Sequence, residues 1–85
     1  MPQQSFTFED LKRILVDRVG LPEEQVVDDP GTTFEALGLD SLAFVEIQLA
    51  VQQQFGFTIP DEDARTITTI GEAIDYTNRR LGEKG

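Results

Sequence analysis

Apolar residues recur at helical spacing in three segments of this chain. The first segment begins at Thr7, a suitable N-cap, and ends at Gly20, which is followed by Leu21 and Pro22 as a stop signal. Its inner face consists of Phe8, Leu11, Leu15 and Val19, with Ile14 beside them. The pattern predicts an amphipathic helix over residues 7–20.

The second segment predicts a helix that starts at Asp40 or Ser41 and ends at Phe55, before Gly56. Its apolar residues cover more than half of the helix circumference, which favours a central helix with several neighbours. One stripe holds Leu42, Val45 and Leu49, and the adjoining faces hold Phe44, Ile47 and Val51.

A short third helix is predicted to open at Pro60 with the acids that follow it, and a fourth at Thr69 with Glu72 as a capping box. The inner face of the fourth helix holds Ile70, Ala73, Ile74, Thr77 and Leu81. Only residues 57–59 are strand-like, and they are too few to build a sheet. We therefore expect an all-α protein, a bundle of three main helices and one short third helix.

Residues 21–40 connect the first two main helices. They contain a turn signal at residues 28–31 and six large apolar residues: Leu21, Val26, Val27, Phe34, Leu37 and Leu39. A structureless loop of about 20 residues is uncommon in a compact domain, so we expect an ordered loop with a helical turn at residues 22–26. We expect one domain over residues 7–82, with flexible ends at residues 1–6 and 83–85.

The chain carries 16 acidic and 7 basic side chains, which give a formal net charge of −9. Such a charge repels nucleic acid and anionic membranes, and it attracts proteins with basic patches. The chain has no cysteine, no secretory signal and no apolar stretch near the roughly 20 residues of a membrane span. We expect a cytoplasmic monomer without a metal site.

The most informative residue is Ser41, at the start of the second helix. The chain has no histidine and no cysteine, so no neighbour could make this serine a catalytic nucleophile. A helix N-terminus offers unpaired N–H groups and partial positive charge, which would stabilise a phosphodiester on the serine. We expect Gly38 to allow a close bend and Leu42 to bury inward. The alternative is that Ser41 or Asp40 is only a helix cap.

The residues around Ser41 resemble those of acyl carrier proteins, and the resemblance covers nearly the whole chain. The matching pieces are Phe34-Glu35-Ala36-Leu37-Gly38-Leu39-Asp40-Ser41-Leu42, Glu46, Phe55-Gly56, Ile59-Pro60-Asp61, and Thr69 with Gly71. The resemblance implies an acyl-carrier-protein-like fold and no catalytic activity. It also implies that Ser41 carries covalent 4′-phosphopantetheine from coenzyme A, with Gly38, Leu39, Asp40 and Leu42 as supporting residues of the motif.

Among such carriers, the chain is most similar to the free-standing carriers of bacterial aromatic (type II) polyketide synthases. The similarity lies in residues 6–11, 30–35 and 76–78. Fatty-acid carriers usually have glutamates where this chain has Gln52-Gln53-Gln54, although residues 60–64 look like theirs. A fatty-acid carrier is therefore the alternative within the family.

The polyketide branch implies a phosphopantetheinyl transferase, a ketosynthase with its chain-length factor, an acyltransferase, and ketoreductase and cyclases as partners. The candidate docking residues are acids: Glu35, Glu46, Asp61, Glu62 and Asp63. A cleft for the acyl chain is predicted from Phe44, Val45, Leu49, Ile67 and Ile70. Solvated surface charge and ordinary core packing are the alternatives for these two sets.

Two other classes of protein share features with this chain. Serine hydrolases of the Gly-Asp-Ser-Leu type have a similar string, but here Leu39 interrupts it and no histidine can serve as a base. A non-carrier protein-interaction bundle is compatible with the acidic helices. Intact mass after incubation with coenzyme A and a transferase separates a carrier from both.

Overall fold

The computed structural model describes the backbone of residues 5–84 and the side chains of residues 5–82, and this part of the chain forms a four-helix bundle. The elements are α1 (Phe8–Ile14), which continues as a π-helix over Leu15–Val19, a 3₁₀ turn (Glu23–Gln25), α2 (Ser41–Phe55), α3 (Asp61–Ala64) and α4 (Ile70–Lys84). The all-α prediction is confirmed. In the described residues the only β pairing is an isolated bridge between Thr33 and Thr69.

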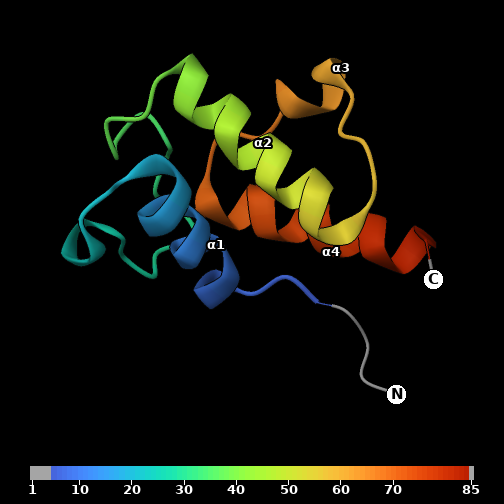
Figure 1. The fold of residues 1–85 in the computed structure, drawn as a ribbon, viewed down its shortest axis with the longest axis horizontal. Helices are drawn as coiled ribbons and strands as arrows, with labels where there is room; N and C mark the ends of the chain where they lie inside the picture. Colours follow the sequence, from blue (N-terminus) through green and yellow to red (C-terminus); the bar gives the residue numbers. More distant parts are fainter. Residues whose placement is uncertain (1–4, 85) are drawn as a thin grey trace.

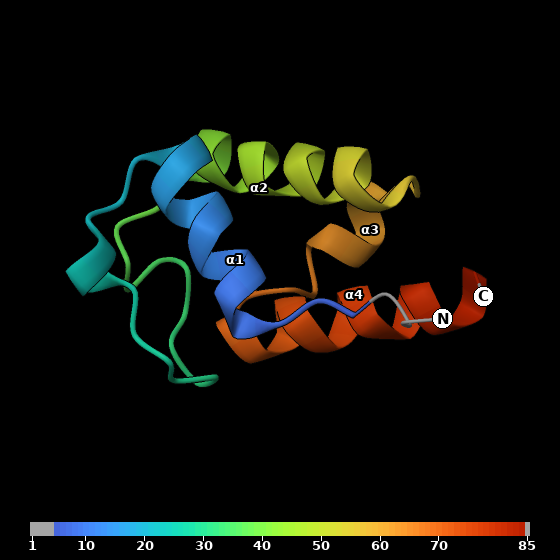
Figure 2. The ribbon, with the colours of Figure 1, turned by 60° about the horizontal axis from the view of Figure 1, so that its bottom comes forward.

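Figure 1 shows the four helices along the chain, and Figure 2 shows the two long helices α2 and α4 on opposite sides of the bundle, with α1 and α3 between them. Figure 2 shows the loop between α1 and α2 gathered at one end of the bundle, and the N-terminal ends of α2 and α4 point toward it. This arrangement brings the start of α2, where Ser41 lies, near the connection between α3 and α4, which is distant in sequence.

Local chemistry explains where the helices begin and end. The Thr7 side chain accepts a hydrogen bond from the N–H of Asp10, whose carboxylate accepts one from the N–H of Thr7, so α1 opens with a capping box. Gly20 and Gly56 have φ values of 88° and 78°, a left-handed conformation that ends the helices before them. The predicted helix limits at these residues are confirmed.

The core closes around Phe6, which is 1% exposed. Its ring meets that of Phe55 edge-on, with centroids 5.8 Å apart. The side chain of Asn78 accepts from the N–H of Phe6 at 2.7 Å and donates to its C=O at 2.9 Å. The prediction of a flexible segment over residues 1–6 is therefore wrong at Phe6, because a buried ring and two hydrogen bonds fix it.

The remaining predictions for the two ends fall largely on residues that are not described. Residues 1–4 and residue 85 lie outside the described part of the chain. The helix α4 extends to Lys84, so the predicted domain limit at residue 82 falls inside its last turn.

The loop between α1 and α2 is ordered because it is anchored on the connection between α3 and α4. The N–H of Phe34 donates to the C=O of Thr68, and the N–H of Ile70 donates to the C=O of Thr32, both at 3.0 Å. The N–H of Gly71 donates to the C=O of Pro30, also at 3.0 Å. A Cβ atom at position 71 would lie 2.8 Å from the Cβ of Pro30, so this approach requires glycine.

Most apolar residues of that loop pack inward, as expected. Val26 and Phe34 are buried, and Leu21, Leu37 and Leu39 pack against the core. The exception is Val27, which is 47% exposed.

Candidate functional site

Ser41 is the first residue of α2, and its side chain is exposed. Asp40 is the N-cap, and its carboxylate accepts a 2.9 Å hydrogen bond from the N–H of Ala43. The C=O of Asp40 accepts a hydrogen bond from the N–H of Phe44 at 3.0 Å, which closes the first turn of the helix. The cap therefore fixes the backbone of the serine and leaves its hydroxyl accessible to an enzyme.

A tight turn over residues 34–39 sets the position of the cap. The C=O of Phe34 accepts hydrogen bonds from the N–H groups of Leu37 and Leu39, both at 3.1 Å. Gly38 has a φ of 81°, a value that side chains with a Cβ rarely adopt. Because the Phe34 side chain is buried, the turn is anchored in the core and delivers residue 41 to the surface.

The geometry at Ser41 fits a phosphodiester. Within the described residues, no hydrogen bond engages the backbone N–H groups of Ser41 and Leu42. These groups carry the partial positive charge of the N-terminus of a 15-residue helix, a place where an anion is stabilised.

The prediction that Leu42 buries inward is wrong, because this side chain is 77% exposed. At 3.6 residues per turn, Leu42 falls on the side of α2 opposite the buried residues Ile47 and Val51. Val45 and Leu49 follow on the same side and are 46% and 41% exposed. We call Leu42, Val45 and Leu49 the apolar stripe.

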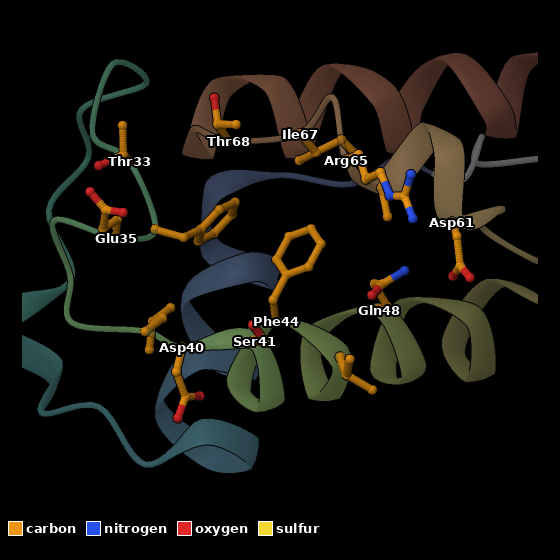
Figure 3. Close-up of a pocket in the computed structure, with 14 residues that line it drawn as sticks. Thr33, Glu35, Asp40, Ser41, Phe44, Gln48, Asp61, Arg65, Ile67 and Thr68 are labelled. Carbon is orange, nitrogen blue, oxygen red and sulfur yellow. The ribbon is translucent and has the colours of Figure 1, made fainter.

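A groove of about 760 Å³ opens beside Ser41, between α2 and the segment that runs from α3 to α4 (Figure 3). Three residues of the predicted acyl-chain cleft line it: Phe44, Val45 and Ile67. The other two do not, because Ile70 is 1% exposed in the core and Leu49 belongs to the apolar stripe.

Sequence reasoning missed several residues that line the groove. They are Thr33, Phe34, Gln48, Ala64, Arg65 and Thr68, together with Glu35, Leu39, Asp40 and Asp61, which were assigned other roles. Helical spacing could have indicated Gln48, one turn after Phe44. The residues from the loop and from α3 are brought to α2 only by the tertiary fold. The rings of Phe34 and Phe44, which both line the groove, pack with their centroids 5.6 Å apart.

The candidate docking acids divide into two groups. Glu35, Glu46, Asp61 and Glu62 are exposed. Asp63 is half-buried, and its carboxylate accepts a 2.7 Å hydrogen bond from the hydroxyl of Tyr76 on α4. The first four are therefore accessible to a partner, whereas Asp63 has a structural contact of its own.

Acidic residues are concentrated in the part of the chain that surrounds Ser41, and basic residues lie outside it. All seven basic residues lie outside residues 21–64, and ten of the sixteen acidic residues lie inside that range. The range covers the long loop, α2 and α3, so the charged residues on these elements around Ser41 are all acidic; Arg65, which directly follows α3, is the basic residue at the groove.

The described residues contain neither a membrane-spanning helix nor a metal-binding cluster. None of their helices is long and apolar enough to cross a membrane. They contain no cluster of three or more His, Cys, Asp or Glu side chains that could hold a metal ion.

Comparisons with known proteins agree with this geometry. Residues 9–77 match the family described as "Phosphopantetheine attachment site". The fold is similar to solution structures of the acyl carrier protein of the actinorhodin polyketide synthase from Streptomyces coelicolor. With its 3,5-dioxohexyl form, a triketide mimic, the TM-score is 0.84 at 31% identity, covering 99% of this chain and 100% of the other.

Two further structures of that carrier protein are equally informative. The apo protein gives a TM-score of 0.82 at 33% identity, covering 94% of this chain and 95% of the other. The octanoyl form gives 0.80 at 31% identity, covering 99% and 100%. The chain therefore belongs to the family of proteins that bear covalent 4′-phosphopantetheine, and it is an acyl carrier protein.

Proposed function

We propose that Ser41 is the sole attachment residue for 4′-phosphopantetheine and that the protein carries a growing polyketide chain. The observation that carries this proposal is the exposed hydroxyl of Ser41 at the N-terminus of α2, on the edge of the groove. The only other serine, Ser5, precedes the first helix. When bound, the arm supplies the thiol that holds an acyl chain as a thioester, which this cysteine-free chain lacks.

The groove is the proposed resting place of the acyl chain. Ser41 lines it, so an arm attached there starts at the groove itself. Phe34, Phe44 and Ile67 offer an apolar surface beside it, which favours carbon chains over water. The similar carrier from Streptomyces coelicolor has been studied with 3,5-dioxohexyl and octanoyl chains.

Partner enzymes are proposed to dock on α2 around the apolar stripe. The stripe leaves three large apolar side chains in solvent beside Ser41, and Glu46 lies among them on the same helix. An enzyme with an apolar patch surrounded by basic residues complements this surface in both respects. The proposed partners are a phosphopantetheinyl transferase, a ketosynthase with its chain-length factor, an acyltransferase, a ketoreductase and cyclases. The carrier itself is proposed to catalyse none of these steps.

The polyketide pathway is favoured over fatty-acid synthesis by the neutral end of α2. The side chain of Gln52 accepts a 2.7 Å hydrogen bond from the N–H of Ile59, and that of Gln53 accepts one from Arg18 at 3.2 Å. These glutamines therefore fix the end of the helix and present no carboxylate to a partner. An enzyme that reads acidic side chains there would lose its ion pairs.

Intact mass spectrometry tests the attachment site. The wild-type protein, incubated with coenzyme A and a phosphopantetheinyl transferase, should gain the mass of one arm. Ser41→Ala should gain none while keeping the helical circular dichroism of the wild type, and Ser5→Ala is the matched control that should be modified fully. An arm on Ser41→Ala would show that the attachment residue is another one.

A further inference from the structure

The far rim of the groove is polar, although its inner surface is apolar. Arg65 follows the last residue of α3, and Gln48 lies on α2. Both line the groove, and Figure 3 shows the guanidinium of Arg65 above the amide of Gln48, on the other side of the groove. Two side chains that donate hydrogen bonds therefore border the same space from different elements.

The guanidinium of Arg65 is available to a ligand. Arg65 is exposed, and within the described residues its guanidinium takes part in no ion pair and no hydrogen bond. Asp61 lies one helical turn earlier and also lines the groove, but its carboxylate is not within 4.0 Å of the guanidinium. By contrast, the hydroxyl of Thr68 at the other end of the groove already donates to Glu72 at 2.8 Å.

The position of these donors suits a chain that is attached at Ser41. Gln48 lies seven residues further along α2, which is roughly 10 Å along the helix axis. A chain that follows the groove from Ser41 passes Phe44 and then reaches Gln48 and Arg65. A saturated chain gains nothing from the two donors. A chain with ketone groups would leave its oxygens unpaired against the apolar surface unless donors meet them there.

We propose that Arg65 and Gln48 are specificity-determining residues that bind the carbonyl oxygens of a β-keto acyl chain in the groove. They make the carrier hold ketone-bearing chains more tightly than saturated chains of equal length. This inference rests on the proposed function, since it requires an arm on Ser41 and an acyl chain in the groove.

The experiment compares two chains of equal length on the complete holo protein. A hydrolysis-stable 3,5-dioxohexyl chain and a hexyl chain are attached to the arm, and intact mass verifies each. Amide and side-chain N–H signals are then followed by ¹H–¹⁵N NMR. In the wild type, the dioxo chain should shift the signals of Arg65 Nε–H, the Gln48 amide and the groove backbone more than the hexyl chain does.

Arg65→Met removes the guanidinium and keeps an unbranched side chain. Loss of a charge-assisted hydrogen bond should weaken the groove-bound state of the dioxo chain by roughly tenfold and leave the hexyl chain unaffected. Gln48→Met should act in the same direction. Arg13→Met is the control, because it makes the same change of charge at an exposed residue of α1 that does not line the groove. Unchanged amide signals in α4, and for the two groove variants also in α1, verify that each variant is folded.

Three results would overturn the inference. The first is an equal response of the dioxo chain in Arg65→Met and Arg13→Met. The second is an equal loss for the dioxo and hexyl chains, which would indicate a change in groove shape and not recognition of oxygen. The third is the absence of groove shifts with either chain, which would also refute groove storage, while arm attachment on Ser41, measured by mass, would still stand.

Discussion

The hydroxyl of Tyr76 on α4 donates a 2.7 Å hydrogen bond to the carboxylate of Asp63 on α3. Arg80 donates to the same hydroxyl at 2.7 Å, and its guanidinium lies 5.0 Å from the ring centroid of Phe57. Burial and the bond to Asp63 raise the pKa of Tyr76, so its hydroxyl remains a donor at neutral pH. The helix α3 has four residues and no side-chain cap, so this contact helps to hold it on α4.

Tyr76→Phe should therefore loosen α3 on α4. We expect a loss of roughly 1 kcal/mol in the free energy of unfolding, because Asp63 and Arg80 lose a shared partner. Hydrogen exchange at residues 61–67 should accelerate more than exchange in α2. If exchange rises equally in both segments, the bond contributes only to global stability and does not hold α3 in particular.

Two glycines of α4 provide a matched pair for the anchoring of the loop. Gly71→Ala places a methyl group 2.8 Å from the Cβ of Pro30 and 3.0 Å from its carbonyl oxygen, so it should cost about 1–3 kcal/mol by displacing the loop. Gly82→Ala has no heavy atom within 4 Å and should stabilise the helix by about 0.5–1 kcal/mol. Urea unfolding of both variants measures the difference, and effects of the same sign would contradict the close packing at Gly71.

Stability should also depend on pH through Glu72. Its carboxylate accepts hydrogen bonds from the N–H and hydroxyl of Thr68 and from the N–H of Thr69, and these bonds lower its pKa from the ordinary value of 4.5. A lowered folded-state pKa means that the stabilisation is present above 4.5 and is lost as the pH falls through the folded-state value.

Glu72→Gln should accordingly be less stable than the wild type at pH 7, and the difference between their urea midpoints should shrink in acid below the ordinary pKa. Glu62→Gln is the comparison, because within the described residues the exposed side chain of Glu62 accepts no hydrogen bond. If the difference in urea midpoint between the wild type and Glu72→Gln does not change with pH, the substitution acts through packing and not through ionisation of Glu72.

Docking on α2 predicts unequal effects from equal changes of charge. Glu46→Lys replaces an acid by a base beside the apolar stripe. Asp75→Lys makes the same change of charge on α4, across the bundle. The first should slow transfer of the arm or of an acyl group about tenfold at low salt, and the second should have little effect. Raising the ionic strength should reduce the difference. Equal rates for the two variants, or no dependence on salt, would contradict a localised docking surface.

The apolar stripe makes a separate contribution. Leu42→Ser removes the most exposed of its side chains without altering charge. It should weaken binding to a partner enzyme at all salt concentrations, because burial of apolar surface is not screened. The helical circular dichroism should be unchanged, since this side chain makes little contact with the core.

Local sequence signals were sufficient for the helices and for the place of Ser41. The residues that begin or end helices act through their own backbone conformation or through bonds to residues within a turn, so their roles could be predicted. They are Thr7, Gly20, Asp40 and Gly56. The buried Phe6 could not, because its partner Asn78 is 72 residues away. For the same reason the hydrogen bond between Tyr76 on α4 and Asp63 on α3 was beyond prediction, although the short helix α3 itself was predicted.

The groove was predicted only in part. Some of its residues follow from local helical spacing, and others are brought there by tertiary packing. Phe44 and Val45 follow from helical spacing on α2, whereas Arg65 is carried to the groove by the packing of α3. The direction of Leu42 was misjudged because both faces of α2 are apolar. Only the packing of α1 and α4 decides which of them is buried.

The choice of pathway can be tested at the end of α2. The malonyl-loaded protein, offered to an aromatic polyketide ketosynthase pair and to a fatty-acid ketosynthase, should be extended efficiently by the first alone. Gln54 is exposed, and within the described residues its side chain makes no hydrogen bond, so Gln54→Glu adds a carboxylate without disturbing the bonds of Gln52 and Gln53.

If the fatty-acid enzyme reads acidic side chains at this place, Gln54→Glu should raise its extension rate several-fold at low salt, and Gln54→Lys should not. Both variants should remain substrates of the polyketide pair, whose docking is expected to centre on Glu46 and the apolar stripe. Efficient extension of the wild type by the fatty-acid enzyme, with none by the polyketide pair, would refute the polyketide assignment. The role of Ser41 would be unaffected by that result, because attachment of the arm precedes the choice of synthase.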